Sequence, residues 1–394
     1  MEIQDYANQQ MKFYETIMNY FACQEESDTE LQILADIFQN QNIIKEKGTF
    51  REFLSLISKL SENYHRSHHF FNKIEKILSH YLPQIKENFI DVELIQIFEN
   101  NELILLFLLE QKMIKNPEES ILSLINVKNS DRRKNYKFYF YPEIKSKLTP
   151  DDTQLIESKL VDYSKDEMSL FYKNRKIGEN DSTICTIIRN DSIESFVSYV
   201  TQTNYPLSGQ IPTSLFETND FLIQKEPLLI EYAAFYGSIQ IIQYLLINDV
   251  KLTPLTWLYA IHSNNAEVIR NILEENKIRP PEDDFVRCVK ESIKCHHNDI
   301  ATYLIEYYIN DKEKLYDIGE DIFDNLYYCI FGCYNYSFVI ENLKKQFAFY
   351  YLCEFGYYEL VKLFLKDKEI DINAVFILKS NFFLIRIQRK FFFY

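Results

Sequence analysis

The stretch that decides the fold is residues 227–248, PLLIEYAAFYGSIQIIQYLLIN, which reads as two short helices joined by a turn. Pro227 suits the first helical turn, where its missing N–H costs no hydrogen bond. Gly237 predicts the end of the first helix, because helices often end in a left-handed conformation that favours a residue without a Cβ atom. The second helix carries isoleucine and leucine at three- and four-residue spacing, which makes one face apolar. A single hairpin cannot bury this face, so the pattern predicts neighbouring hairpins.

Altered copies of this hairpin occur before and after it. Asp191 takes the place of Gly237 in the preceding copy, and Asn264 takes that place in the following one. Ala260 of the following copy corresponds to Ala233, and we expect both alanines to be buried against neighbouring helices. We expect Gly237 and Asn264 to occupy equivalent turns with left-handed or bridge-region backbone. The copies span residues 185–200, 253–273, 292–305 and 347–374, with a weaker copy at residues 329–343.

The last copy carries a family resemblance. GYYELVKLFLKDKEIDINA, which begins at Gly356, closely resembles the second helix and following hairpin of an ankyrin repeat. IIRNDSIESF, QTNYP and EPLLIEYAAFYGS further resemble the large ankyrin-repeat families of unknown function expanded in certain parasitic protists. The resemblance implies a helical solenoid that binds proteins along its concave face and hairpin tips.

The chain departs from the usual ankyrin pattern in two ways. The TPLH signature is nowhere intact, and turn-to-turn spacings of 27, 32 and 38 residues lie on both sides of the usual period of about 33. The spacing of 22 residues between Tyr334 and Gly356 leaves no room for a β-hairpin between those two repeats.

The resemblance also indicates candidate partner-binding residues on the first helix of each hairpin. If the alanines pack inward, the positions beside and after them stay exposed, and large amphipathic side chains often anchor protein interfaces. The alternative is that these side chains pack between repeats in a chain that is rich in aromatic residues throughout. The candidates are Tyr232, Phe235, Tyr236, Tyr259, His262, Tyr351 and Phe355.

Composition and charge exclude several classes of protein. The 394 residues are 46% apolar and 15% aromatic, with only seven glycines and ten prolines, which predicts an all-α fold and not a sandwich, barrel or glycine-lined nucleotide fold. The net charge of −15 disfavours nucleic acid and anionic membranes as partners. No apolar run is long enough to span a bilayer. Seven irregularly spaced cysteines favour a reducing, cytoplasmic location.

Two clusters of potential metal ligands are incomplete. The histidines of the first cluster share a helix face, but no carboxylate or cysteine lies in the same turn. The second cluster falls on the first helix and turn of a copy, where polar residues are common. The chain has no phosphate loop, dinucleotide fingerprint, zinc-protease motif or nucleophile elbow, so we expect no catalytic residue, metal or cofactor. The clusters are His65, His68 and His69, and Cys288, Cys295, His296 and His297.

The sequence predicts three segments. Residues 1–175 form a helical N-terminal domain, and a polar stretch near residues 171–181 marks its end. Residues 176–375 form an ankyrin-type helix-turn-helix solenoid. Residues 376–394, basic and rich in phenylalanine, do not continue the repeat and are a folded-back cap, a membrane- or partner-binding segment, or the product of a misread gene. We expect a noncatalytic protein-binding scaffold, and the alternative is an enzyme with its site in the N-terminal domain.

Overall fold

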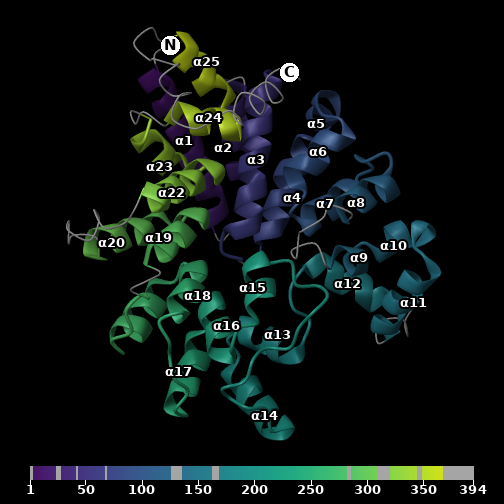
Figure 1. Ribbon diagram of the computed structural model, residues 1–394, viewed down its shortest axis with the longest axis vertical. Coiled ribbons are helices and arrows are strands. Elements are labelled where there is room, and N and C mark those ends of the chain that lie inside the picture. The colour runs from purple at the N-terminus through teal and green to yellow at the C-terminus, as the bar shows by residue number, and fades with distance from the viewer. Residues whose placement is uncertain are drawn as a thin grey trace. The chain divides into compact units, whose positions relative to one another are not determined.

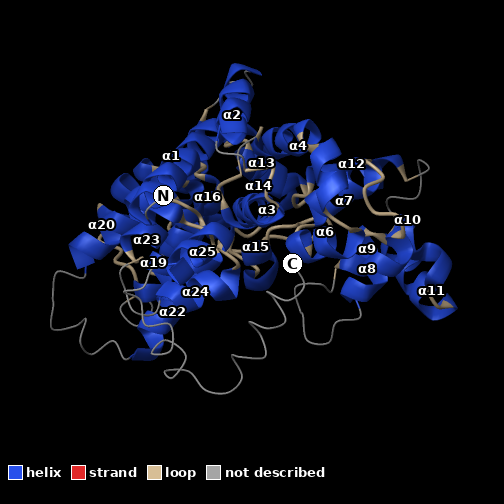
Figure 2. Ribbon diagram, turned by 90° about the horizontal axis from the view of Figure 1, so that it is seen from above, coloured by secondary structure: helices blue, strands red, loops and turns tan. Residues whose placement is uncertain are grey.

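The computed structural model describes residues 3–23, 28–40, 43–66, 69–125, 135–161, 168–281, 285–308, 320–343 and 348–366. These residues form helices joined by turns and loops, and Figure 2 shows no strand among them. Their one β-type pairing is an isolated antiparallel bridge between Gln210 and Leu228. The expected all-α fold is therefore confirmed. None of the helices described here combines the length and the apolar character that a membrane crossing requires. The basic, aromatic tail at residues 376–394 lies outside the described residues.

Contacts divide the chain into two compact units, and each is described by itself. Unit 1 joins residues 1–84 with residues 286–394, and unit 2 comprises residues 85–285. The first 84 residues are thus grouped with the last hairpins of the chain. The boundary expected near residue 175 stays a prediction.

In unit 1 the first helices of the chain pack against the last ones. Helix α1 (Ile3–Ala22) lies against α23 (Tyr336–Glu341) and α25 (Tyr358–Lys366), and α3 (Lys47–Asn63) also lies against α25 (Figure 1). Both α1 and α3 bury one apolar face, and such a face needs a partner element. The remaining helices of this unit are α2 (Asp28–Asn40), α4 (Phe70–His80), α19 (Phe285–Lys294), α20 (Asn298–Tyr308), α22 (Glu320–Gly332) and α24 (Ala348–Phe355), with α5 (Leu82–Asn88) at the boundary.

In unit 2 helical hairpins stack side by side. The first helices of the hairpins, which we call the inner helices, are α13, α16 and α18, and α16 contacts both of the others (Figure 1). Each is followed by its outer helix. The hairpins are α13 (Thr183–Arg189) with α14 (Ile193–Thr203), α16 (Leu229–Tyr236) with α17 (Ile239–Ile247), and α18 (Thr256–Ser263) with the π-helix η4 (Val268–Glu274). The unit also contains α6 (Asp91–Phe98), α7 (Glu102–Glu110), α8 (Pro117–Ile125), α9 (Tyr136–Tyr139), α10 (Tyr141–Ile144), η2 (Lys145–Lys147), α11 (Pro150–Lys159), α12 (Ser169–Ile177) and α15 (Asp220–Lys225).

The hairpin turns share a left-handed residue. Gly237 has φ 71° and Asn264 has φ 50°, and Ala233 and Ala260 are fully buried. These four expectations are confirmed. The weaker copy at residues 329–343 also forms a hairpin, made of α22 and α23. The other turns have Asp191 at φ 46°, His296 at φ 58°, Tyr334 at φ 55° and Gly356 at φ 79°.

Asp191 has a second role that explains an acid at a turn where glycine is easier to accommodate. Its carboxylate accepts hydrogen bonds from the backbone N–H groups of Gln240 at 3.1 Å and Ile241 at 3.0 Å. These groups lie in the first turn of α17, where backbone N–H groups lack partners within the helix. The Ser238 hydroxyl adds a 2.6 Å bond to the Ile188 carbonyl. The first hairpin therefore caps and aligns the second.

Candidate functional site

Aromatic side chains from three helices of unit 2 meet beside the inner helices. Phe235 of α16 and His262 of α18 stack with ring centroids 4.8 Å apart. Phe221 of α15 lies 4.4 Å from the His262 ring and 5.0 Å from the Tyr259 ring, and it stacks on Phe235 at 6.2 Å. We call Phe235, Tyr259 and His262 the aromatic cup, and Phe221 occupies it.

Local sequence explains how the cup is built. Tyr259 and His262 are three residues apart on α18, a spacing that places them on one face of a helix. Phe235 comes from α16, which packs against α18. The occupant is positioned by a short helix that begins at Asn219, whose side chain accepts a hydrogen bond from Leu222 N–H at 3.2 Å.

Most of the candidate partner-binding residues are buried. The expectation that these positions stay exposed is wrong for Tyr232, Phe235, Tyr259, His262 and Tyr351. Tyr236 and Phe355 are half-buried. In unit 2, Phe221 of α15, which is outside the repeat pattern, lies against three of these side chains. Phe235 and His262 also stack on each other between repeats.

Tyr232 faces a half-buried cation instead of solvent. Arg189 Nη1 donates to the Tyr232 hydroxyl oxygen at 2.9 Å, and Arg189 Nε pairs with Glu179 at 2.8 Å. The guanidinium also lies 5.9 Å from the centre of the Tyr236 ring. Burial raises the pKa of the Tyr232 hydroxyl well above its ordinary value, so the hydroxyl stays neutral. This network consolidates the stack of inner helices.

The last two candidates belong to unit 1 and do not contribute to the cup. Tyr351 stacks on Phe331 of α22, with ring centroids 5.4 Å apart. Phe355 packs edge-on against Tyr328 at 4.9 Å. Both side chains therefore join α24 to α22, which is the packing between repeats that was the alternative expectation.

A second polar cluster surrounds Glu52 in unit 1. Tyr336 donates its hydroxyl hydrogen to the Glu52 carboxylate, and the Tyr358 N–H donates at 3.2 Å. Tyr6 and Gln10 help to line a cavity of about 10 Å³ beside this carboxylate, which is room for about one water molecule. Burial raises the pKa of Glu52 to about 8, although the two hydrogen bonds oppose the shift.

The two clusters of potential metal ligands meet in unit 1. His65 Nδ1 and His297 Nε2 lie 3.3 Å apart, so a histidine of the first cluster lies beside a histidine of the second. His296 Nδ1 lies 2.8 Å from the Tyr14 hydroxyl oxygen. Burial lowers the pKa of His65 to about 4 and that of His296 to about 3, which leaves both imidazoles neutral. His68 lies outside the described residues.

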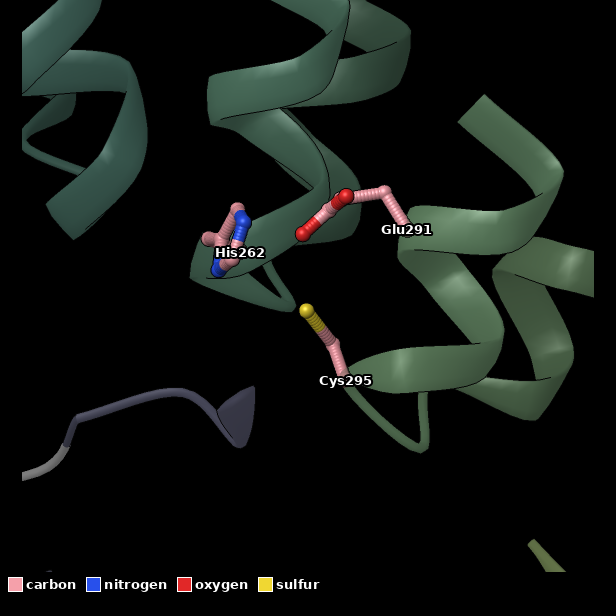
Figure 3. Close-up of side chains that lie close together, drawn as sticks. All are labelled: His262, Glu291 and Cys295. Carbon is pink, nitrogen blue, oxygen red and sulfur yellow. The ribbon is translucent and has the colours of Figure 1, made fainter. Parts of the chain in front are cut away.

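Glu291 and Cys295 form another pair of potential ligands at the end of α19. Their side chains project toward the same side (Figure 3), and the carboxylate and thiol atoms lie within 4.8 Å of each other. Two ligands from one helix are fewer than the three or four typical of protein zinc sites, and we propose no metal for this pair. Figure 3 also draws His262, which belongs to α18 of unit 2.

Comparison of the chain with protein-family models, curated proteins and solved structures gave no match.

Proposed function

We propose that this chain is a noncatalytic protein-binding scaffold built on ankyrin-type repeats. The observation that carries the proposal is the correspondence between successive hairpins of unit 2. Gly237 and Asn264 are left-handed at equivalent turns, and Ala233 and Ala260 are fully buried at equivalent positions of α16 and α18. Stacked helical hairpins of this kind form extended surfaces that suit protein partners.

The partner-contacting surface that we propose is the connection between α17 and α18, residues 247–255, which we call the tip. Ile247 is 82% exposed and Leu255 is 48% exposed, one at each end of the tip. Exposed apolar side chains contribute favourable free energy when a partner removes them from water, at roughly 25 cal/mol per Å². We propose the tip as the contact surface in place of the inner-helix aromatic residues, because most of those residues are buried.

The proposed partner is another protein in the cytoplasm. The net charge of −15 opposes binding to the phosphate backbone of nucleic acid. All seven cysteines are free, which supports a reducing compartment.

Affinity capture with matched baits tests this function. The full-length chain is immobilised as wild type, as Ile247→Glu and as Leu155→Glu, the last a control at a 54% exposed leucine of α11 in the same unit. We expect at least one protein to be enriched from native lysate by the wild type and the control but not by Ile247→Glu. With the purified protein, the Ile247→Glu bait should bind about tenfold more weakly, as expected when an apolar contact is replaced by a charge. Equal capture by all three baits would refute the tip as the contact surface.

An enzyme with its site in residues 1–175 was the alternative. Substrate sites are usually clefts of roughly 300–1,000 Å³ with convergent polar groups. The polar cavity beside Glu52 has a volume of about 10 Å³, so it holds about one water molecule and not a substrate. No contact among the described residues of this range favours the enzyme over the scaffold, so we propose no second function.

A further inference from the structure

We propose that the aromatic cup of unit 2 recognises a short partner helix that presents a phenylalanine followed by an aliphatic residue. Helix α15 would then be the chain's own occupant of this site. The inference rests on the proposed protein-binding function and names the chemistry of a second contact.

Helix α15 lies in an insertion between the hairpins α13–α14 and α16–α17. Asp191 and Gly237 are 46 residues apart, whereas Gly237 and Asn264 are 27 apart. The base of the insertion is closed by backbone hydrogen bonds from Ile211 to the Pro227 carbonyl and from Leu229 to the Gly209 carbonyl, both 2.9 Å. Residues 212–226 therefore leave the hairpin stack and return to the same place, as compact surface loops do. The connection between α17 and α18 contains no such segment, so hairpins of this stack can be joined without one.

The next observation is the geometry of the occupant. The Phe221 ring is half-buried, whereas the residues of the cup are almost fully buried. Its neighbour Leu222 is buried as well. Aromatic rings favour offset-stacked and edge-to-face contacts at centroid distances of about 4.5–7 Å, and the rings around Phe221 provide both arrangements. The cup thus fits a planar aromatic side chain carried on one helical turn.

Contacts other than those of Phe221 attach the chain before α15 and after it. Before it, Phe216 packs edge-on against Phe171 at 5.5 Å, and the Thr218 hydroxyl donates to the Gly178 carbonyl at 2.7 Å. After it, Glu226 ends the helix in a left-handed conformation with φ 45°, and the Pro227 carbonyl accepts a hydrogen bond from the Ile211 N–H at 2.9 Å. Helix α15 has six residues, and a helix this short has little stability of its own. Withdrawal of Phe221 therefore leaves the anchors on either side in place.

The last step is the type of recognition. A helix that inserts apolar anchors into a preformed groove is a common mode of peptide binding. A partner helix with the Phe-Leu pair of α15 would make the same ring contacts in trans. Because α15 competes for the cup, a partner helix can bind only those molecules in which the cup is free. Its apparent affinity for the intact chain is the intrinsic affinity multiplied by that fraction.

The test uses a labelled synthetic peptide with the sequence of residues 215–226, LFETNDFLIQKE. Its binding to the full-length chain is measured by fluorescence anisotropy for the wild type, Phe221→Ala, and Tyr199→Ala, a control at another half-buried aromatic residue. We expect the peptide to bind Phe221→Ala about tenfold more tightly than the wild type, whereas Tyr199→Ala should match the wild type. The same peptide with alanine in place of Phe221 should bind none of the proteins.

A further variant checks that binding occurs in the cup. Phe221→Ala combined with Phe235→Leu should lose the peptide affinity gained by Phe221→Ala. The fluorescence of Trp257, which is the one tryptophan of the chain and fully buried in α18, reports whether the inner helices remain folded. If Phe235→Leu alters this fluorescence, His262→Gln replaces it in the same experiment.

Three results would overturn the inference: no peptide binding to Phe221→Ala, equal binding to Phe221→Ala and the wild type, or a dimer in which α15 is exchanged between copies. Failure of the scaffold function looks different. If the peptide binds Phe221→Ala but the baits capture no protein, the cup exists and the proposed function fails. If the baits capture a partner and the peptide binds no variant, the function stands and this inference fails.

Discussion

The hydroxyl of Tyr336 donates a hydrogen bond to the carboxylate of Glu52, although 284 residues separate the two in sequence. The same carboxylate accepts the backbone N–H of Tyr358, the first residue of α25. One side chain of α3 thus joins two hairpins from the other end of the chain. Since the Glu52 carboxyl is buried among these contacts and beside a small cavity, its protonation state should affect how firmly unit 1 holds together.

The first prediction concerns the pH dependence of Glu52. Its pKa is raised from 4.5 to about 8 in the folded chain, so the folded state binds this proton more tightly than the unfolded state does. The resulting stabilisation is fully present below pH 4.5 and is lost as the pH rises toward 8. Over that window the free energy of unfolding should fall by up to about 1.4 kcal/mol per pH unit.

Urea unfolding of the full-length chain at several pH values between 4.5 and 8 measures this effect. Glu52→Gln, which cannot titrate, should show a flatter dependence than the wild type. Glu341→Gln, at an exposed position of α23, serves as the control and should follow the wild type. Parallel curves for the wild type and Glu52→Gln would show that Glu52 does not titrate in this range.

The second prediction concerns the close packing of the inner helices. Ala233 is fully buried on α16, and Ala233→Leu should lower the free energy of unfolding by about 1–3 kcal/mol because added methylene groups strain a packed contact. Ala266→Leu, at an exposed position in the same unit, is the matched control. Thermal and urea unfolding compare the two, and equal stability of both variants would mean that Ala233 does not set the spacing of the helices.

The third prediction concerns Asp191 as a cap supplied from one hairpin to the next. Asp191→Ala removes two hydrogen bonds to the start of α17 and keeps an unfavourable left-handed residue, so it should cost about 1–2 kcal/mol. Asp191→Gly should cost less, because glycine relieves the backbone while losing the same bonds. Urea unfolding ranks the variants, and a glycine variant less stable than the alanine variant would contradict this explanation.

The sequence predicted what depends on local pattern. A glycine or asparagine at the turn and an alanine at the packed position have direct backbone and steric causes, so Gly237, Asn264, Ala233 and Ala260 could be placed from spacing alone. The left-handed conformation of Tyr334 was harder to foresee, because a bulky aromatic residue is unusual in that conformation. Tyr334 is fixed there by contacts of its own, including a stack on Tyr357 with ring centroids 5.0 Å apart.

Relationships that depend on distant parts of the chain could not be read from the pattern. The aromatic candidates were expected to be exposed because the repeat template contains nothing like Phe221, which reaches the cup from an insertion. The contact between Glu52 and Tyr336 could not be foreseen, since no local feature shows that these two residues will meet. His65 and His297 each fell in a cluster considered by itself, and only the fold brings them together.

Hydrogen–deuterium exchange of the full-length chain, with and without the protein enriched by the wild-type bait, shows whether the tip contacts the partner. We expect slower exchange in residues 247–255 when the partner is present, and no such change for the Ile247→Glu chain mixed with the same protein. Unchanged exchange at residues 247–255, with protection confined to helices far from this tip in sequence, would contradict the claim that the hairpin stack binds its partner there.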